Sequence, residues 1–187
     1  MIESALLQLG IERVYYRKLT SFVETVERWN RSINLTAAKS RGEIVDHVLD
    51  CLHVVPLLAG RKRILDVGSG GGFPAVIEAI CLPESTITAL EPTHKKHAFL
   101  RACSRELSLP NLVPLAERMA DHAAADYDAA TSRATFDLVE WLGLGRDRVR
   151  PGGIVIGFEA TPRSDLPEGA IRHPYAHGDR TRALVIA

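Results

Sequence analysis

A glycine-rich turn that directly follows a short apolar run contains the residues best suited to chemistry. Residues 64–74 read Ile-Leu-Asp-Val-Gly-Ser-Gly-Gly-Gly-Phe-Pro, and Glu91 closes the next apolar run. A glycine turn lets a ligand approach the backbone without meeting a Cβ atom, and a carboxylate about 20 residues later can accept hydrogen bonds from ribose hydroxyls. The pairing therefore predicts a site for an adenosine-containing cofactor.

The type of cofactor follows from how the turn departs from the dinucleotide fingerprint. Gly68-x-Gly70 is followed by Phe73, and the third glycine of that fingerprint is missing. A nicotinamide enzyme aims helix amides at a pyrophosphate, which Phe73 and Pro74 suit poorly. S-adenosylmethionine has no phosphate, and a turn shaped by Gly68, Gly70 and Gly72 can admit its methionine moiety. The turn favours methyl transfer over hydride transfer, with a turn that binds no ligand as the alternative.

Beyond residue 60, the elements that must position this turn alternate between short apolar runs and longer amphipathic stretches. This alternation predicts strands and helices around a parallel sheet. Pro74 suits the first turn of a helix, Thr93 can cap the next helix, and Arg150-Pro-Gly-Gly is expected to end a helix before the fifth strand. The strands are expected near residues 63–67, 86–91, 111–115, 127–131 and 152–158, and a closing hairpin near 170–175 and 182–187.

About a third of the chain precedes the glycine turn, and this portion reads as helical. Ser40 and Glu43 form a Ser-x-x-Glu capping box, which predicts a helix from about 41 to 57. We expect residues 1–60 to form a helical extension packed on a core of residues 61–187, the whole being one compact unit. An earlier helix is predicted by apolar residues at spacings of three and four, namely Leu19, Phe22, Val26, Trp29 and Ile33.

Composition narrows the possible partners and location. The 187 residues suit a single domain, and Lys plus Arg equals Asp plus Glu at 23 each, so any RNA contact must be a local patch. No apolar run approaches the roughly 18 residues of a membrane span, and the amino terminus does not resemble a secretion signal. We expect a cytoplasmic monomer that does not contact membranes.

The cysteines and histidines show no pattern that would hold a metal. The three cysteines are far apart and read as reduced core residues, and the paired histidines lack Cys or carboxylate partners at ligand spacing. We therefore expect no metal site. The residues concerned are Cys51, Cys81, Cys103, His94, His97, His173 and His177.

Four separated blocks of the sequence resemble one known family. On these blocks the chain resembles the RsmG/GidB methyltransferases, which form 7-methylguanosine in small-subunit ribosomal RNA with S-adenosylmethionine. The first and last blocks are specific to that family, whereas the glycine turn indicates only a class of methyltransferases. The blocks are Trp29 to Thr36 (Trp-Asn-Arg-Ser-Ile-Asn-Leu-Thr), His47 to Asp50 (His-Val-Leu-Asp), Asp66 to Pro74, and Ser132 to Ala134 (Ser-Arg-Ala).

The resemblance implies a fold, a cofactor and a substrate. The fold is the α/β, Rossmann-like class I S-adenosylmethionine-dependent methyltransferase fold, with a mostly parallel seven-stranded sheet and helices on both faces. The partner is small-subunit (16S) ribosomal RNA or the ribosomal particle. By this resemblance, Glu91 binds the ribose hydroxyls, and Met119 and Ala120 contact the adenine. The cofactor-binding residues carried over are Gly68, Gly70, Phe73, Glu91, Met119, Ala120 and Arg133.

The implied reaction demands little acid–base chemistry. Guanine N7 presents an unprotonated lone pair at neutral pH, so direct in-line methyl transfer requires alignment and no general base. Arg133 is expected to orient the cofactor or the guanine, the alternative being a surface arginine at a strand end. Asn34 and Asp50 either tie the helices of the extension or fold over the cofactor as a lid. His47 reads as a packed histidine rather than a base.

The chain departs from the family pattern at three places. Gly71 and Ala75 stand where the family has proline and glycine, and Glu159 with Ala160 stands where the family has lysine and glycine. These changes leave open a small-molecule methyltransferase, or a degenerate cofactor-binding relative. Two basic sets are candidates for RNA contact, with the second favoured: Lys95, Lys96, Arg101 and Arg105, or Arg28, Arg31, Lys39 and Arg41.

Overall fold

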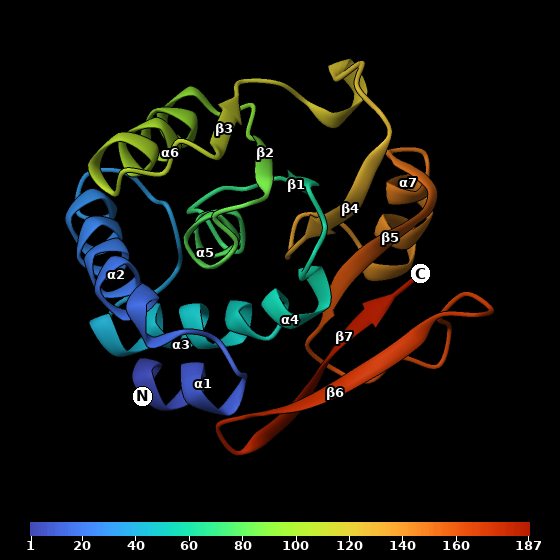
Figure 1. The fold of residues 1–187 in the computed structure, drawn as a ribbon, viewed down its shortest axis with the longest axis horizontal. Coiled ribbons are helices and arrows are strands. Elements are labelled where there is room, and N and C mark those ends of the chain that lie inside the picture. Colours follow the sequence, from blue (N-terminus) through green and yellow to red (C-terminus); the bar gives the residue numbers. More distant parts are fainter.

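The computed structural model describes residues 1–187 and contains one seven-stranded sheet with helices against it (Figure 1). The strand order is β3-β2-β1-β4-β5-β7-β6; β1 to β5 run parallel, β7 is antiparallel to β5, and β6 is antiparallel to β7. The predicted mostly parallel sheet is confirmed. Its strands are β1 (Arg63–Val67), β2 (Thr86–Leu90), β3 (Leu112–Leu115), β4 (Tyr127–Ser132), β5 (Val149–Glu159), β6 (Ile171–His177) and β7 (Arg180–Ile186).

Four helices precede the first strand and three lie between later strands, with two short 3-10 turns. None of the helices is both long enough and apolar enough to cross a membrane. The helical segments are α1 (Ile2–Gln8), η1 (Arg13–Tyr15), α2 (Tyr16–Asn30), α3 (Arg41–Leu52), α4 (Val55–Leu58), α5 (Ala75–Cys81), α6 (His94–Glu106), η2 (Met119–Asp121) and α7 (Leu138–Arg146).

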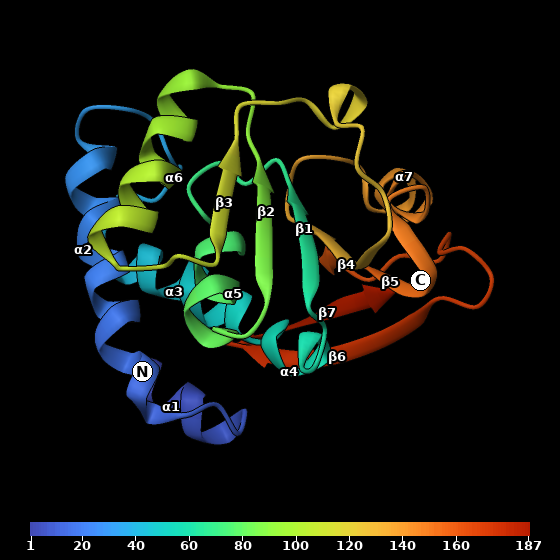
Figure 2. The same ribbon diagram turned by 45° about the horizontal axis from the view of Figure 1, so that its top comes forward.

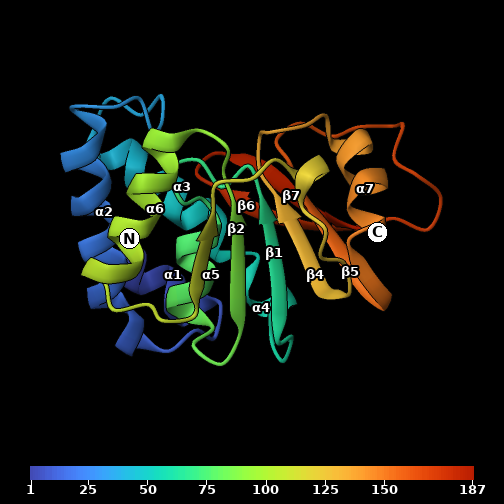
Figure 3. The same cartoon turned by 90° about the horizontal axis from the view of Figure 1, so that it is seen from above.

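The two faces of the sheet bury different sets of side chains, because successive residues of a strand point to opposite faces. Ile64 belongs to the large apolar cluster shared with α1 to α6, whereas Leu65 belongs to a smaller cluster with Trp141 of α7. Figures 2 and 3 show α2, α3, α5 and α6 together and α7 apart from them. Helices therefore cover both faces, the second face through α7.

The amino-terminal helices pack on the core but end earlier than the sequence predicts. Ile33 lies beyond α2, because the Asn30 side chain accepts hydrogen bonds from the Leu35 and Thr36 amides and turns the chain. The helix expected over 41–57 stops at Leu52, and α4 begins three residues later with proline in its first turn. Proline has no N–H with which to continue a preceding helix.

Helix capping follows the sequence at α3 but not at α6. Ser40 Oγ accepts from the Glu43 amide at 3.2 Å, as the predicted capping box requires, whereas the Glu43 carboxylate accepts from the Lys39 amide, one residue before the N-cap, at 2.9 Å. Thr93 occupies the N-cap position of α6, but its side chain makes no capping hydrogen bond. Its amide donates to Glu91, so it is held by the preceding carboxylate.

The Arg150-Pro-Gly-Gly segment lies inside β5 and does not end the preceding helix, contrary to the sequence-based expectation. The helix α7 ends at Arg146, and β5 pairs with β4 first through Val149 and again from Ile154. The intervening residues form a bulge, which the glycines permit. A Cβ on Gly153 would lie 3.0 Å from the Tyr127 carbonyl oxygen, so a larger residue would push the two strands apart.

Candidate functional site

The carboxyl ends of β1, β2 and β4 lie side by side, because β1 pairs in parallel with both neighbours. This places Gly68 after β1, Glu91 after β2 and Arg133 after β4 at one edge of the sheet. Open parallel sheets bind ligands at this edge. Residues far apart in the sequence thus meet where a cofactor site is predicted.

Glu91 holds the glycine turn in its shape. Its Oε2 accepts from the Gly70 amide at 2.9 Å, and its Oε1 accepts from the Thr93 amide at 2.8 Å. Gly70 has a φ of +50°, a conformation that side chains disfavour. An ionised carboxylate has about four acceptor positions, so two backbone donors leave capacity for the hydroxyls of a sugar.

Gly68 admits a close approach from the loop after β4. Its φ is +74°, and a Cβ atom there would lie 2.2 Å from Thr135 Oγ1. Its amide donates to the Leu90 carbonyl at 2.9 Å. The absence of a side chain therefore serves the contact with Thr135 as well as any ligand.

A first cavity of about 300 Å³ opens beside this turn. It brings together Gly68, Met119 and Ala120, three of the predicted cofactor residues, and the residues on either side of Glu91 also line it. The sequence did not predict Thr135 and Phe136 as site residues. Most of the wall is apolar, which suits the faces of an adenine ring: Val67, Leu90, Pro92, Met119, Ala120 and Phe136.

Phe73 and Arg133 lie next to each other, outside the wall of the first cavity. The Arg133 guanidinium carbon lies 5.4 Å from the centre of the Phe73 ring, within the range of a cation–π contact. Phe73 is buried against Phe22 of α2, with the ring centres 5.2 Å apart. The glycine turn is thereby anchored to the amino-terminal helices.

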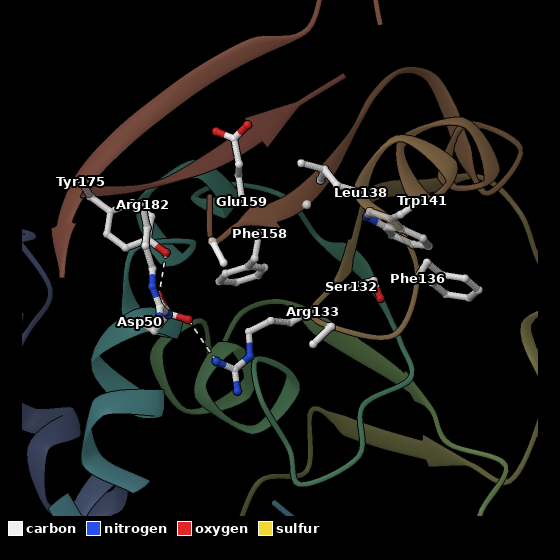
Figure 4. Close-up of a pocket in the computed structure, with 13 residues that line it drawn as sticks. Asp50, Ser132, Arg133, Phe136, Leu138, Trp141, Phe158, Glu159, Tyr175 and Arg182 are labelled. Carbon is white, nitrogen blue, oxygen red and sulfur yellow. Dashed lines mark hydrogen bonds and ion pairs between the residues drawn. The ribbon is translucent and has the colours of Figure 1, made fainter. Parts of the chain in front are cut away.

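Asp50 joins three distant parts of the chain. Its carboxylate accepts from Arg133 Nη1 at 3.0 Å and from the Tyr175 hydroxyl at 2.7 Å, and it forms an ion pair with Arg182 Nη1 at 2.9 Å (Figure 4). Burial alone would raise the pKa of Asp50, but the Tyr175 hydroxyl and the two arginines outweigh burial and lower the pKa. Asp50 is therefore ionised, and it ties α3 to the hairpin β6–β7 and to the loop after β4.

His47 and Asn34 flank the glycine turn from the extension. The His47 ring lies 5.4 Å from that of Phe73, and burial followed by the charge of Arg133 lowers its pKa, so the ring is neutral at pH 7. Asn34 is exposed. Its neighbour Leu35 has its carbonyl oxygen 3.2 Å from where a Gly71 Cβ would stand, so this loop lies against the turn.

A second cavity of about 220 Å³ lies between β4, β5, α7 and the hairpin (Figure 4). It shares Phe136 with the first cavity and is lined by Arg133 and Asp50, both of which the sequence predicted as candidate site residues. Its other principal side chains were not predicted as site residues, and no local motif marks them: Trp141, Phe158, Tyr175 and Arg182.

Two buried carboxyl groups meet below the glycine turn. Thr131 Oγ1 lies 3.2 Å from Asp66 Oδ1 and 3.0 Å from Glu78 Oε1, and neither carboxyl-bearing residue is more than 1% exposed. Burial raises the pKa of Asp66 to about 6 and that of Glu78 well above its ordinary value. One hydroxyl hydrogen cannot serve both acceptors, so a proton on Glu78 completes the arrangement.

Each of the two basic sets predicted to contact RNA contains residues that form ion pairs and residues that form none. Arg28 pairs with Glu106, and Arg41 with Glu27 and Glu24, whereas Arg31 and Lys39 are exposed with no carboxylate within 4.0 Å. Arg31 and Lys39 line a polar groove of about 390 Å³. In the α6 set, Arg105 pairs with Glu106, which leaves Lys95, Lys96 and Arg101 without ion pairs.

No group of three or more His, Cys, Asp or Glu side chains is arranged to hold a metal.

Sequence comparison identifies relatives along most of the chain. The family model described as rRNA small subunit methyltransferase G (GidB) matches residues 15–166. Ribosomal RNA small subunit methyltransferase G of Laribacter hongkongensis is 40% identical over 156 residues, covering 81% of this chain and 75% of that protein. The protein of the same name from Bordetella pertussis is 33% identical over 190 residues, covering 96% and 83% respectively.

Solved structures share the fold at low sequence identity. The O-methyltransferase of Bacillus cereus, crystallised with SAH, aligns with a TM-score of 0.61 and 17% identity over 89% of each chain. TomG of Streptomyces achromogenes, an O-methyltransferase crystallised with SAM, aligns with a TM-score of 0.63 and 16% identity over 99% of this chain and 94% of that one. These likenesses confirm the predicted Rossmann-like methyltransferase fold.

Proposed function

This chain belongs to the rRNA small subunit methyltransferase G (GidB) family, and from that membership we propose that it methylates N7 of a guanine in small-subunit (16S) ribosomal RNA. Membership makes the chain an S-adenosylmethionine-dependent rRNA methyltransferase. The acceptor atom, the mechanism and the contact residues are our proposals. The observation that carries them is the first cavity, which is lined by Gly68 of the glycine turn, by the residues on either side of Glu91 and by residues after β3.

The residues in and beside the first cavity each suit one part of the cofactor. Glu91 has free acceptor positions for the ribose hydroxyls, while Met119 and Ala120 bound the space for the adenine. Gly68 and Gly70 keep side chains away from the backbone along which the methionine moiety would lie. When bound, S-adenosylmethionine supplies a methyl group activated by its sulfonium charge.

The protein's part in the reaction is alignment, without a general base. His47 packs on Phe73 and is neutral, and Asp66 and Glu78 are enclosed and cannot reach a substrate. Guanine N7 needs no deprotonation, so proximity and orientation can supply the rate enhancement. We propose that Arg133 orients the reactants and that Asp50 holds Arg133 in place, with Asn34 and His47 supporting the same edge of the turn.

The proposed partner is ribosomal RNA or the ribosomal particle, and the proposed enzyme is a cytoplasmic monomer. We propose that Arg31 and Lys39 contact RNA phosphates, because they are the members of the amino-terminal basic set whose charge no carboxylate neutralises. We also propose that residues 1–60 and 61–187 act as one compact unit, since side chains from both contribute to the same apolar cluster.

The proposal is tested by comparing the nucleosides of small-subunit rRNA from cells with and without this protein, using mass spectrometry. The proposal predicts 7-methylguanosine in the first RNA and its loss from the second. Equal 7-methylguanosine in both would reject the RNA assignment. A small-molecule methyltransferase would instead methylate metabolites without salt-sensitive RNA binding, and a degenerate relative would bind little S-adenosylmethionine in calorimetry.

A further inference from the structure

We propose that the second cavity receives the target guanine, extruded from the RNA, with Phe158 as the surface on which the base stacks and arginine N–H groups as donors to its O6 atom. This inference rests on the proposed function, because it locates the methyl acceptor of that reaction. The proposal assigns roles to Phe158 and Arg182, which no motif in the sequence marks.

The position of the second cavity suits a methyl acceptor. It shares Phe136 with the first cavity, and both are bounded by the loop after β4, the second through Arg133 and the first through Thr135. Reacting atoms must approach to about 3 Å for transfer. A base in the second cavity would therefore lie next to a methyl donor that reaches the loop from the first.

The walls of the second cavity provide flat apolar surfaces. Phe136 and Trp141 stack with their ring centres 5.7 Å apart and an angle of 15° between the planes. Phe158 is partly exposed and lies between the Asp50 cluster and Leu138 in Figure 4. Enzymes that act on a nucleobase commonly extrude it and stack it against aromatic or apolar side chains.

The two arginines that line this cavity retain hydrogen-bond donors. Arg133 Nη1 donates a hydrogen bond to Asp50, Arg182 Nη1 forms an ion pair with the same carboxylate, and Arg182 Nε is buried with no hydrogen-bond partner. A guanidinium carries five N–H donors, so both arginines retain some. Guanine presents the O6 acceptor where adenine presents an N6 amino donor. Arginine donors therefore favour guanine over adenine.

The negative charge of Glu159 would repel RNA at this cavity, but its arginine partners neutralise it. Its carboxylate accepts from Arg172 Nε at 2.6 Å, from Arg172 Nη2 at 2.8 Å and from the Arg163 amide at 2.9 Å. Figure 4 shows its side chain directed away from Arg133. The Glu159 carboxylate is thus occupied by Arg172 and Arg163 and does not compete for the arginine donors of the cavity.

The test compares Phe158→Leu with Phe158→Tyr, because leucine removes the aromatic face while tyrosine keeps it. Both variants are assayed for methylation of small-subunit particles and for S-adenosylmethionine affinity by calorimetry. We expect Phe158→Leu to lower kcat/KM about tenfold, the loss of one stacked base, with Phe158→Tyr staying within about twofold of the wild type. The cofactor affinity of both should be unchanged, which also reports that they are folded.

Several outcomes would overturn the inference. Unchanged kcat/KM in Phe158→Leu would place the base elsewhere while the proposed function stands, and a loss of cofactor affinity that matches the loss of methylation would assign the cavity to the cofactor. A wild-type protein that methylates no rRNA would instead reject the proposed function itself.

A second measurement tests the choice of base with free nucleotides. GMP and AMP are compared as inhibitors of rRNA methylation by the wild-type protein. We expect GMP to inhibit at a lower concentration than AMP, and this difference to persist in Phe158→Tyr. Equal inhibition by the two nucleotides would contradict the role given to the arginine donors.

Discussion

At the scale of single residues, Glu91 holds the glycine turn and offers acceptors to the ribose, and one substitution weakens both roles. Glu91→Gln keeps one acceptor oxygen, for either the Gly70 or the Thr93 amide, and removes the charge offered to the ribose hydroxyls. Hydrogen bonds to charged groups contribute about 1.5–3 kcal/mol, so we expect S-adenosylmethionine to bind at least about tenfold more weakly. Isothermal titration calorimetry measures this change.

A matched control for Glu91→Gln lies at the other end of the same strand. Glu84→Gln makes the identical chemical change at an exposed position before β2, and it should leave cofactor affinity unchanged. Equal affinities for Glu91→Gln and the wild type would remove Glu91 from the cofactor site.

Glu78 makes the stability of the protein depend on pH. Its pKa is raised in the folded state by burial, so folding retains a proton that the unfolded chain releases above about pH 4.3. The stability from this group is fully present below that pH and is lost as the pH rises toward the folded-state pKa. Glu78→Gln cannot ionise and should lose less stability than the wild type between about pH 5 and pH 8.

Urea unfolding of both proteins at the two pH values measures the effect of Glu78. The midpoint of the wild type should fall more than that of Glu78→Gln as the pH rises. Parallel changes in the two proteins would show that Glu78 is already ionised in the folded state, and would contradict the shared arrangement with Thr131.

At the scale of elements, Asp50 fastens the hairpin β6–β7 to α3. Asp50→Ala leaves Arg133 and Arg182 without their common carboxylate, and breaking a buried charge pair costs about 3–5 kcal/mol. We expect that loss of stability together with faster hydrogen exchange in the hairpin. Denaturant unfolding and exchange mass spectrometry report the two effects.

The control for Asp50→Ala is Asp46→Ala, at a carboxylate one turn earlier on α3 that makes no ion pair. It should leave both stability and hairpin exchange close to those of the wild type. If Asp50→Ala also exchanged normally in the hairpin, the apolar contacts of β6 and β7 would be sufficient to hold it.

The sequence predicted elements where a local pattern determines them. Apolar runs identified all five parallel strands, and the capping box marked the start of α3. The prediction was wrong for Arg150-Pro-Gly-Gly, because glycine and proline permit a bulge within a strand as readily as a turn. The spacing of Ile33 predicts a helical residue, although the contacts made by Asn30 end the helix first.

For the candidate site, too, the sequence predicted the residues whose chemistry is local and missed those that depend on contacts between distant parts of the chain. The glycine turn and Glu91 could be predicted because their chemistry is local to two neighbouring strands. Tyr175 meets Asp50 from 125 positions away, and this contact depends on how the hairpin folds back against α3. Of the residues that line the second cavity, the sequence therefore marked only Asp50 and Arg133 as candidate site residues.

At the scale of the whole molecule, a net charge of zero requires RNA binding to depend on a few unpaired cations. Removing one phosphate contact should reduce the slope of log affinity against log salt by about 0.7–0.9. We expect Arg31→Ala combined with Lys39→Ala to flatten the slope by about twice that amount, with S-adenosylmethionine affinity unchanged. Filter binding of small-subunit rRNA over a range of salt concentrations measures it.

The comparison for this pair is Lys95→Ala with Lys96→Ala, which removes two charges from α6. An unchanged slope in the Lys95 and Lys96 variant would support RNA binding at the amino-terminal surface that carries Arg31 and Lys39. The reverse result would move the RNA to the face formed by α6.

The most direct test of the central claim is reconstitution. Small-subunit particles from cells lacking this protein are incubated with the purified chain and isotopically labelled S-adenosylmethionine, and the rRNA is digested to nucleosides for mass spectrometry. We predict that the label appears in 7-methylguanosine with the wild type and is strongly reduced with Glu91→Gln. No labelled rRNA, or label in any other nucleoside, would contradict the account.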